Sequence, residues 1–442
     1  MRFSRYPEYK DSGADWLGSV PSHWTVTRLK NVVEIRKRIA GELGFDVLSI
    51  TQKGIRKKDI DSNDGQLSMD YSKYQLVNPG DFAMNHMDLL TGYVDISPFF
   101  GVTSPDYRVF SVRNHGSCHD RFLLRIFQNC YENKIFFPFG QGSSHLGRWR
   151  LPTEQFNEFI IALPPPEEQL SIAKFIDYEL VTIENLIGDQ ERLIALLKEK
   201  RQAVISRAVT HGLDPRVPMK DSGIEWLGDV PASWKVMALK RLIERGSSIS
   251  YGIVQPGDPQ EVGIPFVQTT NMSSGGFDID RLQRTTAEIA SAYPRSRLKG
   301  GEVLLGIRAS IGAAYVAPAH LKGANLSRGV ARIECCSDLM PEFLAWYIRG
   351  DQVEKYWELL KQGSTFNEVS IETVREMKVP LPSFDEQREI AEYIEEVAEG
   401  FDELIEEAEI ASALLMERRS ALIFAAVTGK IDVRQLAVSE VA

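Results

Sequence analysis

A long helical pattern occurs twice in this chain, and this repeat restricts what the protein can fold into. In the first copy, from about Pro166 to Thr210, apolar residues recur every three or four positions, which places them on one side of an α-helix. The second copy, from about Phe384 to Thr428, carries apolar residues at the same phases. At a constant offset of 218, the copies share the identical pairs Glu168/Glu386, Gln169/Gln387, Ile172/Ile390, Ala173/Ala391, Leu186/Leu404, Ala203/Ala421, Val209/Val427 and Asp214/Asp432. A whole helix repeated in register predicts an internally duplicated protein.

The two helical copies are expected to pair with each other. Each spans roughly 40 residues, or about 60 Å of helix, and an apolar stripe of that length needs a partner in water. The block between the helices begins where the first ends and finishes where the second begins, which favours antiparallel pairing. Two helices that each lie on their own domain remain the alternative. The residues predicted to form the seam are Ile172, Ile176, Ile183, Leu186, Leu193, Leu197, Val204, Ile390, Ile394, Val397, Phe401, Leu404, Leu415 and Leu422.

A second repeat lies ahead of each globular block. Residues 10–24 and 220–234 are identical at ten of fifteen positions, at an offset of 210. The shared residues are turn formers and large apolar anchors, including Trp24 and Trp234. We interpret both segments as structural lead-ins that pack on a domain core.

Between these repeats lie two blocks, at about 25–163 and 235–382. Both contain short runs of β-branched and aromatic residues separated by Gly, Pro, Asn and Asp, followed by a helical stretch, which predicts mixed α/β domains. The predicted boundaries are 1–163, lead-in and first domain; 164–210, first helix; 211–382, second lead-in and domain; and 383–442, second helix and tail. We therefore expect an α+β protein with two mixed α/β domains, an antiparallel coiled coil and internal pseudo-twofold symmetry.

Charge is distributed unevenly along the chain. The net charge is −10, yet residues 25–160 and 235–378 each come to about +2, so the remainder carries about −14. Twelve carboxylates and one arginine lie between Asp385 and Glu409. Weakly basic blocks joined by acidic helices permit DNA binding by the blocks, with the acidic helix facing solvent or a protein.

Several classes of protein are disfavoured by missing features. The N-terminus lacks an apolar signal-peptide core, and no run of residues is long and apolar enough for a membrane span. The four cysteines have no CxxC spacing, which favours reduced thiols in the cytoplasm over a disulfide or zinc site. The sequence contains no GxxxxGK[ST] loop, no GxGxxG after a strand and no NPPF-like methyltransferase motif. We therefore predict no catalysis, metal or cofactor in this chain.

Over its whole length the chain resembles the specificity subunit of type I restriction–modification systems. The resemblance rests on YPEYKDSGADWLGSVPSHW, its return at 220–234, and the helix openings PPPEEQLSIAKFI and PSFDEQREIAEYI. The string GEVLLGIRASIGAAYVAPAHLKGANLSRGVARI looks like the core of a target-recognition domain. The resemblance implies two domains that each read half of a split DNA site, and helices that space them and dock two methyltransferase subunits. Restriction subunits would join the full complex, and S-adenosylmethionine, ATP and Mg would be bound by the partners.

Candidate DNA contacts are polar residues on predicted loops. Gln and Asn can bind adenine edges, Arg and Lys bind guanine or phosphate, and Ser and Thr bind phosphate. A coiled-coil scaffold whose two blocks bind proteins is the alternative. In the first block the candidates are Gln52, Lys53, Arg56, Lys57, Lys58, Asn85, Gln141, Ser143, Ser144 and His145. In the second they are Tyr251, Gln268, Thr269, Asn271, Arg308, Ser310, Asn325, Arg328, Gln362, Ser364 and Thr365.

Overall fold

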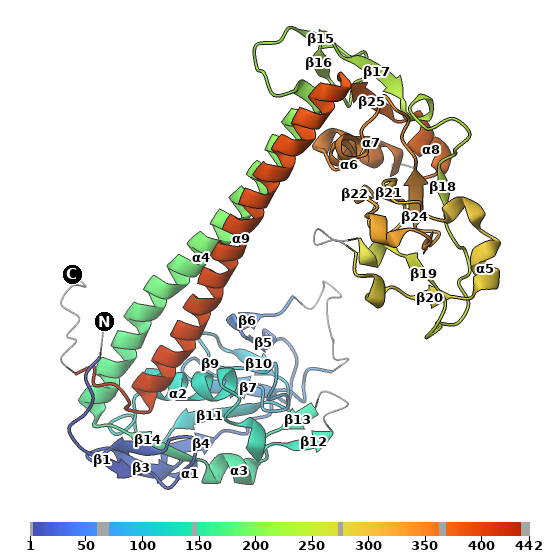
Figure 1. Cartoon of the computed structure of the whole chain (residues 1–442). Helices are drawn as coiled ribbons and strands as arrows, with labels where there is room; N and C mark the ends of the chain where they lie inside the picture. The colour runs from blue at the N-terminus through green and yellow to red at the C-terminus, as the bar shows by residue number, and fades with distance from the viewer. Residues whose placement is uncertain (1–2, 60–69, 144–147, 273–276, 362–367, 435–442) are drawn as a thin grey trace. The chain divides into compact units, whose positions relative to one another are not determined.

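The structure, a computed structural model of the whole chain, describes residues 3–59, 70–143, 148–272, 277–361 and 368–434 (Figure 1). The chain divides into two compact units. Unit 1 comprises residues 1–190 and 410–442, and unit 2 comprises residues 191–409. The boundary between the units cuts both long helices, α4 (Pro166–His211) and α9 (Phe384–Val427), so that each unit contains one globular domain and half of each helix. The observed helix bounds lie within one residue of those read from the sequence.

The globular part of unit 1 is built on a four-stranded antiparallel sheet of order β4-β11-β8-β9. The aromatic rings of Phe82 and Phe110 stack on this sheet at 5.0 Å, and Phe127 of α2 packs against them. The sheet strands are β4 (Val33–Ile35), β8 (Phe82–Met84), β9 (Val94–Ile96) and β11 (Arg108–Val112). Around it lie β5 (Leu48–Thr51), β6 (Gly54–Lys57), β7 (Gln75–Val77), β10 (Gly101–Thr103), β12 (Gln141–Ser143), β13 (Arg148–Arg150), α1 (Leu29–Val32), α2 (Asp120–Glu132), the 3-10 turn η1 (Phe137–Phe139) and α3 (Thr153–Glu158).

Unit 2 repeats this plan with a four-stranded sheet of order β18-β24-β21-β22. The helical stretch expected after it is interrupted at Arg349 and Gly350, so α6 (Pro341–Ile348) and α7 (Asp351–Lys361) are separate helices. The strands are β18 (Ser250–Tyr251), β21 (Val303–Gly306), β22 (Ala314–Val316) and β24 (Val330–Ile333), with β19 (Ile264–Val267) between β20 (Arg284–Thr285) and β23 (Asn325–Leu326). Two shorter helices are α5 (Ala287–Ser291) and α8 (Ile371–Glu376).

The lead-in segments form equivalent hairpins. In unit 1, β1 (Tyr9–Asp11) pairs with β2 (Ser19–Pro21), and β3 (Thr25–Arg28) pairs with β14 (Ile160–Leu163). In unit 2, β15 (Met219–Asp221) pairs with β16 (Asp229–Pro231), and β17 (Lys235–Ala238) pairs with β25 (Lys378–Leu381). Trp24 and Trp234 are both buried. The lead-ins therefore join the start of each domain to the strand that enters each long helix.

The long helices pair in antiparallel fashion. In unit 1, Arg419 Nε of α9 lies 3.8 Å from the carboxylate of Glu184 of α4. In unit 2, Lys198 and Arg201 of α4 form ion pairs with Glu409 and Asp402 of α9, at 3.5 and 3.1 Å. The residue number falls along α9 as it rises along α4, which defines the antiparallel direction.

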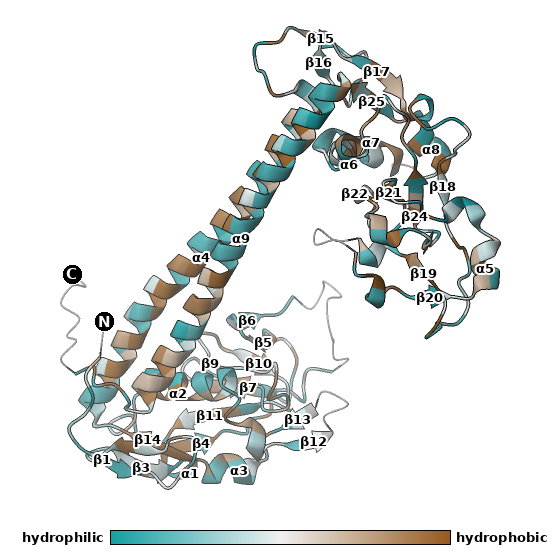
Figure 2. Ribbon diagram, viewed as in Figure 1, coloured by the Kyte–Doolittle hydropathy of each residue, from teal (hydrophilic) through white to brown (hydrophobic). Residues whose placement is uncertain are grey.

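The seam of the helix pair has steps of three and four residues. On α4 the buried or half-buried positions are Leu180, Ile183, Ile187, Gln190, Ile194, Leu197, Arg201, Val204 and Ala208. On α9 they are Ile394, Ala398, Phe401, Ile405, Ala408, Ser412, Leu415, Arg419, Leu422 and Ala426. These alternating steps of three and four are the heptad spacing of a coiled coil. Figure 2 shows hydrophobic residues recurring among polar ones along both helices.

Four predicted seam residues are wrong. Leu186, Leu193 and Leu404 are 44%, 43% and 50% exposed, and the residue after each in the chain is the one that faces the seam. The fourth is Val397, which is half-buried but comes one residue before the seam position Ala398. Of the others, Ile172, Ile176, Ile183, Ile390, Ile394 and Leu422 are buried, and Leu197, Val204, Phe401 and Leu415 are half-buried. Ile172 and Ile176 belong to the core of unit 1 that also contains Trp24 and Phe122, and Ile390 and Ile394 belong to the core of unit 2. The ends of each helix are therefore built into a globular domain.

Candidate DNA-recognition surfaces

Each long helix begins with a Glu–Gln pair that fixes the domain beside it. Gln169 accepts a 2.7 Å hydrogen bond from the main-chain N–H of His119 and donates to the carbonyls of Ser117 and Pro164. Gln387 accepts from Met340 N–H at 2.8 Å and donates to the carbonyls of Asp338 and Pro382. Both glutamines are fully buried. The same side chain therefore orients equivalent loops in both units, and the recognition loops are carried on a common frame.

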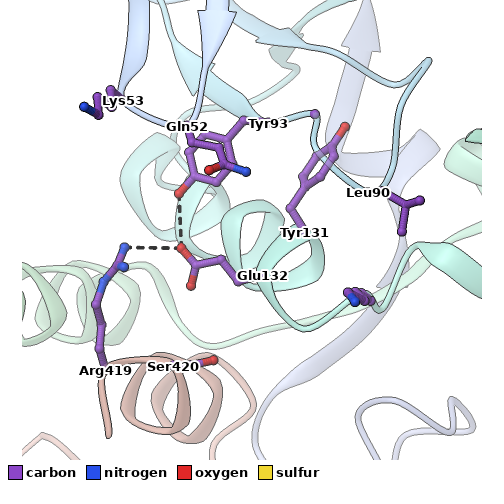
Figure 3. A pocket seen from close by; sticks show the side chains of 10 residues that line it. Gln52, Lys53, Leu90, Tyr93, Tyr131, Glu132, Arg419 and Ser420 are labelled. Atoms are coloured by element: carbon purple, nitrogen blue, oxygen red, sulfur yellow. Dashed lines mark hydrogen bonds and ion pairs between the residues drawn. The ribbon is translucent and has the colours of Figure 1, made fainter. Parts of the chain in front are cut away.

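The β5–β6 hairpin of unit 1 presents four of the candidates. Gln52 and Lys53 form its exposed tip, and Arg56 and Lys57 are exposed on β6. The Thr51 hydroxyl, which accepts from Lys53 N–H and donates to the Gly54 carbonyl, fixes the tip. Lys57 forms an ion pair of 2.6 Å with Asp46. At the tip, Gln52 and Lys53 line a pocket together with Arg419 and Ser420 of α9 (Figure 3).

Lys58 lies in a different pocket, which sequence reasoning missed. Its volume is about 310 Å³, and its walls include Tyr71, Tyr74 and Tyr107, with Ser49, Met87 and Asp106 beside them. Tyr71 and Tyr74 contact each other edge to face at 4.9 Å. Tyrosine rings can stack on bases or contact a thymine methyl group, and Ser and Asp can hydrogen-bond to base edges. The clustering could not be read from the sequence, because five separate segments of the chain contribute to it.

The remaining first-block candidates fall into three groups. Asn85 is half-buried, its carbonyl accepts from Tyr131 Oη at 2.7 Å, and its side-chain oxygen is buried. Gln141 is exposed on β12. Ser143 belongs to β12, but its side chain is outside the described part, as are Ser144 and His145 altogether.

In unit 2 the structure gathers part of the predicted set around Gly329. A Cβ atom at Gly329 would lie 3.4 Å from the Thr269 methyl group and 3.7 Å from Cβ of Arg308. Arg308 forms an ion pair with Glu368, and Arg328 is exposed next to Gly329. Gln268 and Asn271 close a capping box on each other across the short helix at residues 269–271. Tyr251 and Ser310 are exposed, and Gln362, Ser364 and Thr365 lie outside the described residues.

Asn325 is a correction to the predicted set. It is only 1% exposed, and its side-chain amide donates to the hydroxyl of Ser296 at 3.0 Å and to the carbonyls of Ala290 and Tyr293. These contacts tie β23 to α5 and to the segment after it. An amide with three internal partners and no exposure stabilises the domain and does not reach a base edge.

Buried titratable groups in the described residues are structural. Burial and the charges of Arg108 and Arg150 lower the pKa of His86 to about 3. Burial raises the pKa of Cys118 to about 12 and that of Cys335 to about 12, so neither is a thiolate at neutral pH. Within the described ranges, no group of three or more His, Cys, Asp or Glu side chains is arranged to hold a metal ion. Over the same residues, no helix combines the length and apolar composition needed to cross a membrane.

These features define a class of protein: a duplicated subunit in which two equivalent frames carry two dissimilar sets of polar loops. Residues 21–190 and 231–413 match the family model described as the type I restriction modification DNA specificity domain. Because the match covers most of the chain, the protein belongs to that family.

Relatives and solved structures agree with the family assignment. The chain is 25% identical over 286 residues to the type I restriction enzyme EcoBI specificity subunit of Escherichia coli, covering 64% of this chain and 60% of the relative. It is 23% identical to the putative MjaX specificity subunit of Methanocaldococcus jannaschii, covering 95% and 96%. A chain from a study of type I R-M complex assembly superposes with a TM-score of 0.71 at 16% identity, covering 92% and 98%. The HsdS subunit from Thermoanaerobacter tengcongensis gives a TM-score of 0.53 at 16% identity, covering 93% and 98%, so these two share the fold.

Proposed function

We propose that this chain is the non-catalytic DNA-recognition subunit of a type I restriction–modification complex. Each globular domain, within residues 1–163 and 211–382, would read one half of a split DNA site. The observation that carries the proposal is that the two units share the same framework contacts but differ in the polar loops that this framework holds. The contacts of Gln169 and Gln387 repeat in both units, whereas Lys58 with its tyrosine pocket has no counterpart in the Thr269–Arg308 cluster.

The outer surfaces of the long helices support docking of partner subunits. Leu186 and Leu414 of unit 1 are 44% and 59% exposed. Their equivalents at an offset of 218 are Leu404 and Leu196 of unit 2, which are 50% and 52% exposed. Exposed leucines at equivalent places in both units indicate two similar docking sites for apolar surfaces.

The heptad positions place these leucines and the ion pairs on opposite flanks. Leu186, Leu193, Leu404 and Ala411 each come one residue before a seam position. Leu196 and Leu414 follow Leu193 and Ala411 by three residues, so they lie on the same side of the helix. The charged partners Glu184, Lys198, Asp402 and Glu409 each come one residue after a seam position. One flank of the helix pair therefore carries the exposed leucines, and the other carries the ion pairs between the helices. We infer that two methyltransferase subunits dock on the apolar flank, one per unit, and that restriction subunits join this complex.

The test is an exchange of one recognition domain. The protein is expressed with its methyltransferase partner in a host without other adenine methylation, and the methylated sequence is determined by methylome sequencing. Residues 235–378 are then replaced by the matching block of another family member. One half of the methylated sequence is expected to change while the other half is retained. Methylation without any sequence preference, or a change in both halves, would contradict the proposal.

A measurement of DNA binding distinguishes the proposed function from the alternative, a scaffold that binds only proteins. The assembled complex should bind duplex DNA with an affinity that falls steeply as salt rises, because phosphate contacts release counterions. A protein scaffold would show no such binding with or without its partner.

A further inference from the structure

A basic pocket lies between the first globular domain and the second long helix, within unit 1 (Figure 3). It has a volume of about 510 Å³. Its walls come from the β5–β6 hairpin tip, the loop at Leu90–Tyr93, the end of α2 and one turn of α9. Lys53, Lys134 and Arg419 contribute three positive charges, and Glu132 contributes one negative charge.

The single carboxylate of the pocket is already engaged. Glu132 accepts a hydrogen bond of 3.2 Å from Tyr93 Oη and one of 3.3 Å from Arg419 Nη2. Burial and the nearby Glu132 raise the pKa of Tyr93, so that its hydroxyl stays a donor at neutral pH. Among the residues that the structure describes, Lys53 and Lys134 form no ion pair with a carboxylate. The pocket therefore keeps two exposed cations whose charge is not balanced internally.

Lys134 occupies a backbone conformation that disfavours lysine. Its φ is +54°, and its N–H donates to the Tyr131 carbonyl in the turn that ends α2. Glycine or asparagine is the usual residue at such a helix end, because a Cβ atom is strained in the left-handed region. A lysine in this place is unfavourable for the fold, and it points to a use for the ammonium group.

The hairpin tip that carries Lys53 is held from both sides. Inside the hairpin, the hydroxyl of Thr51 makes the two contacts described above. Beneath it, a Cβ atom at Gly54 would lie 2.9 Å from the carboxylate of Asp95, so only glycine fits there, and φ at Gly54 is +93°. Gln52 and Lys53 are therefore presented on a fixed turn.

We propose that this pocket binds a phosphate group, with Lys53 and Lys134 as cationic contacts and Gln52 as a neutral donor. Arg419 is already paired with Glu132 and Glu184, and the Ser420 hydroxyl donates to the side chain of Asn133 at 3.1 Å. Two lysine ammonium groups without a carboxylate partner, together with the amide of Gln52, suit the charge and the oxygens of a phosphate. The phosphate has two possible sources, the DNA backbone and a free phosphate. The DNA source rests on the proposed function and reassigns Gln52 and Lys53 from base reading to sequence-independent backbone contact.

The test uses Lys53→Gln, Lys134→Gly and the double variant in the assembled complex. Lys134→Gly removes the ammonium group and relieves the left-handed backbone, so a loss of binding cannot result from unfolding. Lys10→Gln, an exposed lysine of β1 away from the pocket, is the matched control. Affinity for duplex DNA with and without the methylated sequence is measured across a salt series, and inorganic phosphate is titrated into each protein by calorimetry.

If the phosphate belongs to DNA, the slope of log affinity against log salt becomes shallower by up to about 0.9 in the double variant, because one phosphate contact is lost, and by less in each single variant. Affinity then falls by the same factor for both duplexes, and the preference between them is unchanged. If the source is a free phosphate, the wild type and Lys10→Gln bind phosphate, the double variant does not, and DNA binding is unaffected. The inference would be overturned if the double variant showed the same salt dependence of DNA binding and the same phosphate titration as the wild type. A wild-type complex that binds no DNA at all would instead refute the proposed function.

Discussion

The indole Nε1 of Trp24 donates a 2.9 Å hydrogen bond to the buried carboxylate of Glu168 in the first turn of α4. The equivalent pair in unit 2, Trp234 and Glu386, is joined at 3.0 Å. The lead-in repeat and the helix repeat, which are separate patterns in the sequence, are thus bonded to each other in both units. Unit 1 adds two more groups, because the hydroxyl of Tyr6 donates to Glu168 at 2.7 Å and His23 Nε2 lies 2.8 Å from it.

The two glutamates should therefore differ in their contribution to stability. Glu168→Gln weakens three contacts to a buried charge and is expected to lower the free energy of unfolding by about 2–4 kcal/mol, whereas Glu386→Gln should cost about 1 kcal/mol. Urea denaturation followed by tryptophan fluorescence measures both. Glu167→Gln, at the exposed neighbouring position, is the control. Equal losses at 168 and 386 would contradict the assignment of the extra contacts.

The exposed leucines give a prediction about assembly. Leu186→Asp with Leu404→Asp changes surface residues, so the stability of the isolated protein should change by less than about 1 kcal/mol. Binding of the methyltransferase partner should be lost, because each carboxylate would be desolvated at the docking site. Pull-down and size-exclusion chromatography measure assembly. Ile187→Asp is the contrasting variant, since it enters the seam and should destabilise the protein itself. A double variant that assembles like the wild type would place docking elsewhere.

His86 predicts a specific acid sensitivity. Its pKa is about 3 in the folded protein, chiefly because of burial, and near 6.5 when unfolded. The unfolded chain therefore binds the extra proton first as pH falls, and stability declines from about pH 6.5 towards pH 3, by at most about 1.4 kcal/mol per pH unit for this group. His86→Asn should show a shallower decline in urea titrations at each pH. A His86→Asn profile that runs parallel to that of the wild type would contradict this assignment.

The segments at residues 4–9 and 429–432 contact each other within unit 1, which predicts tolerance to circular permutation. Tyr9 Oη donates to the Gly429 carbonyl at 3.0 Å, and Asp432 N–H donates to the Ser4 carbonyl at 2.8 Å. Joining residue 442 to residue 1 by a short Gly/Ser linker and opening the chain at the exposed Pro215 should preserve folding. Expressed with its partner, the permuted protein should methylate the same sequence. A permutant that assembles but methylates another sequence would contradict the pseudo-symmetry.

The helix repeat, its length and its direction could be predicted from the sequence, because periodicity and identical pairs are properties of the chain itself. The side that faces the seam could not be predicted fully. Leu186 and Ile187 are adjacent and both apolar, as are Leu404 and Ile405, and the seam also includes the polar Gln190 and Arg201. Each helix pairs on one side and carries exposed leucines on another, so its apolar stripe is wider than the coiled coil requires. The sequence alone therefore does not show which edge of the stripe faces the partner helix.

The candidate DNA contacts, too, could be predicted from the sequence only in part. Residue type indicated which side chains can bind DNA, but burial decided that Asn325 is internal. The tyrosine pocket around Lys58 and the basic pocket around Lys134 arise from segments far apart in the chain. Their members have no shared sequence spacing, so only the fold brings them together.

The division of the two long helices between the units has a consequence for synthesis on the ribosome. Unit 2 is one continuous stretch, residues 191–409, so all of its contacts are available before translation ends. Unit 1 needs Leu422, Ile423 and Val427 in its core, and these leave the ribosome after the whole of unit 2. The domain that is made first is therefore completed second, and a nascent chain that stops short of the final helical turns exposes an unfinished apolar core to cellular proteases and chaperones.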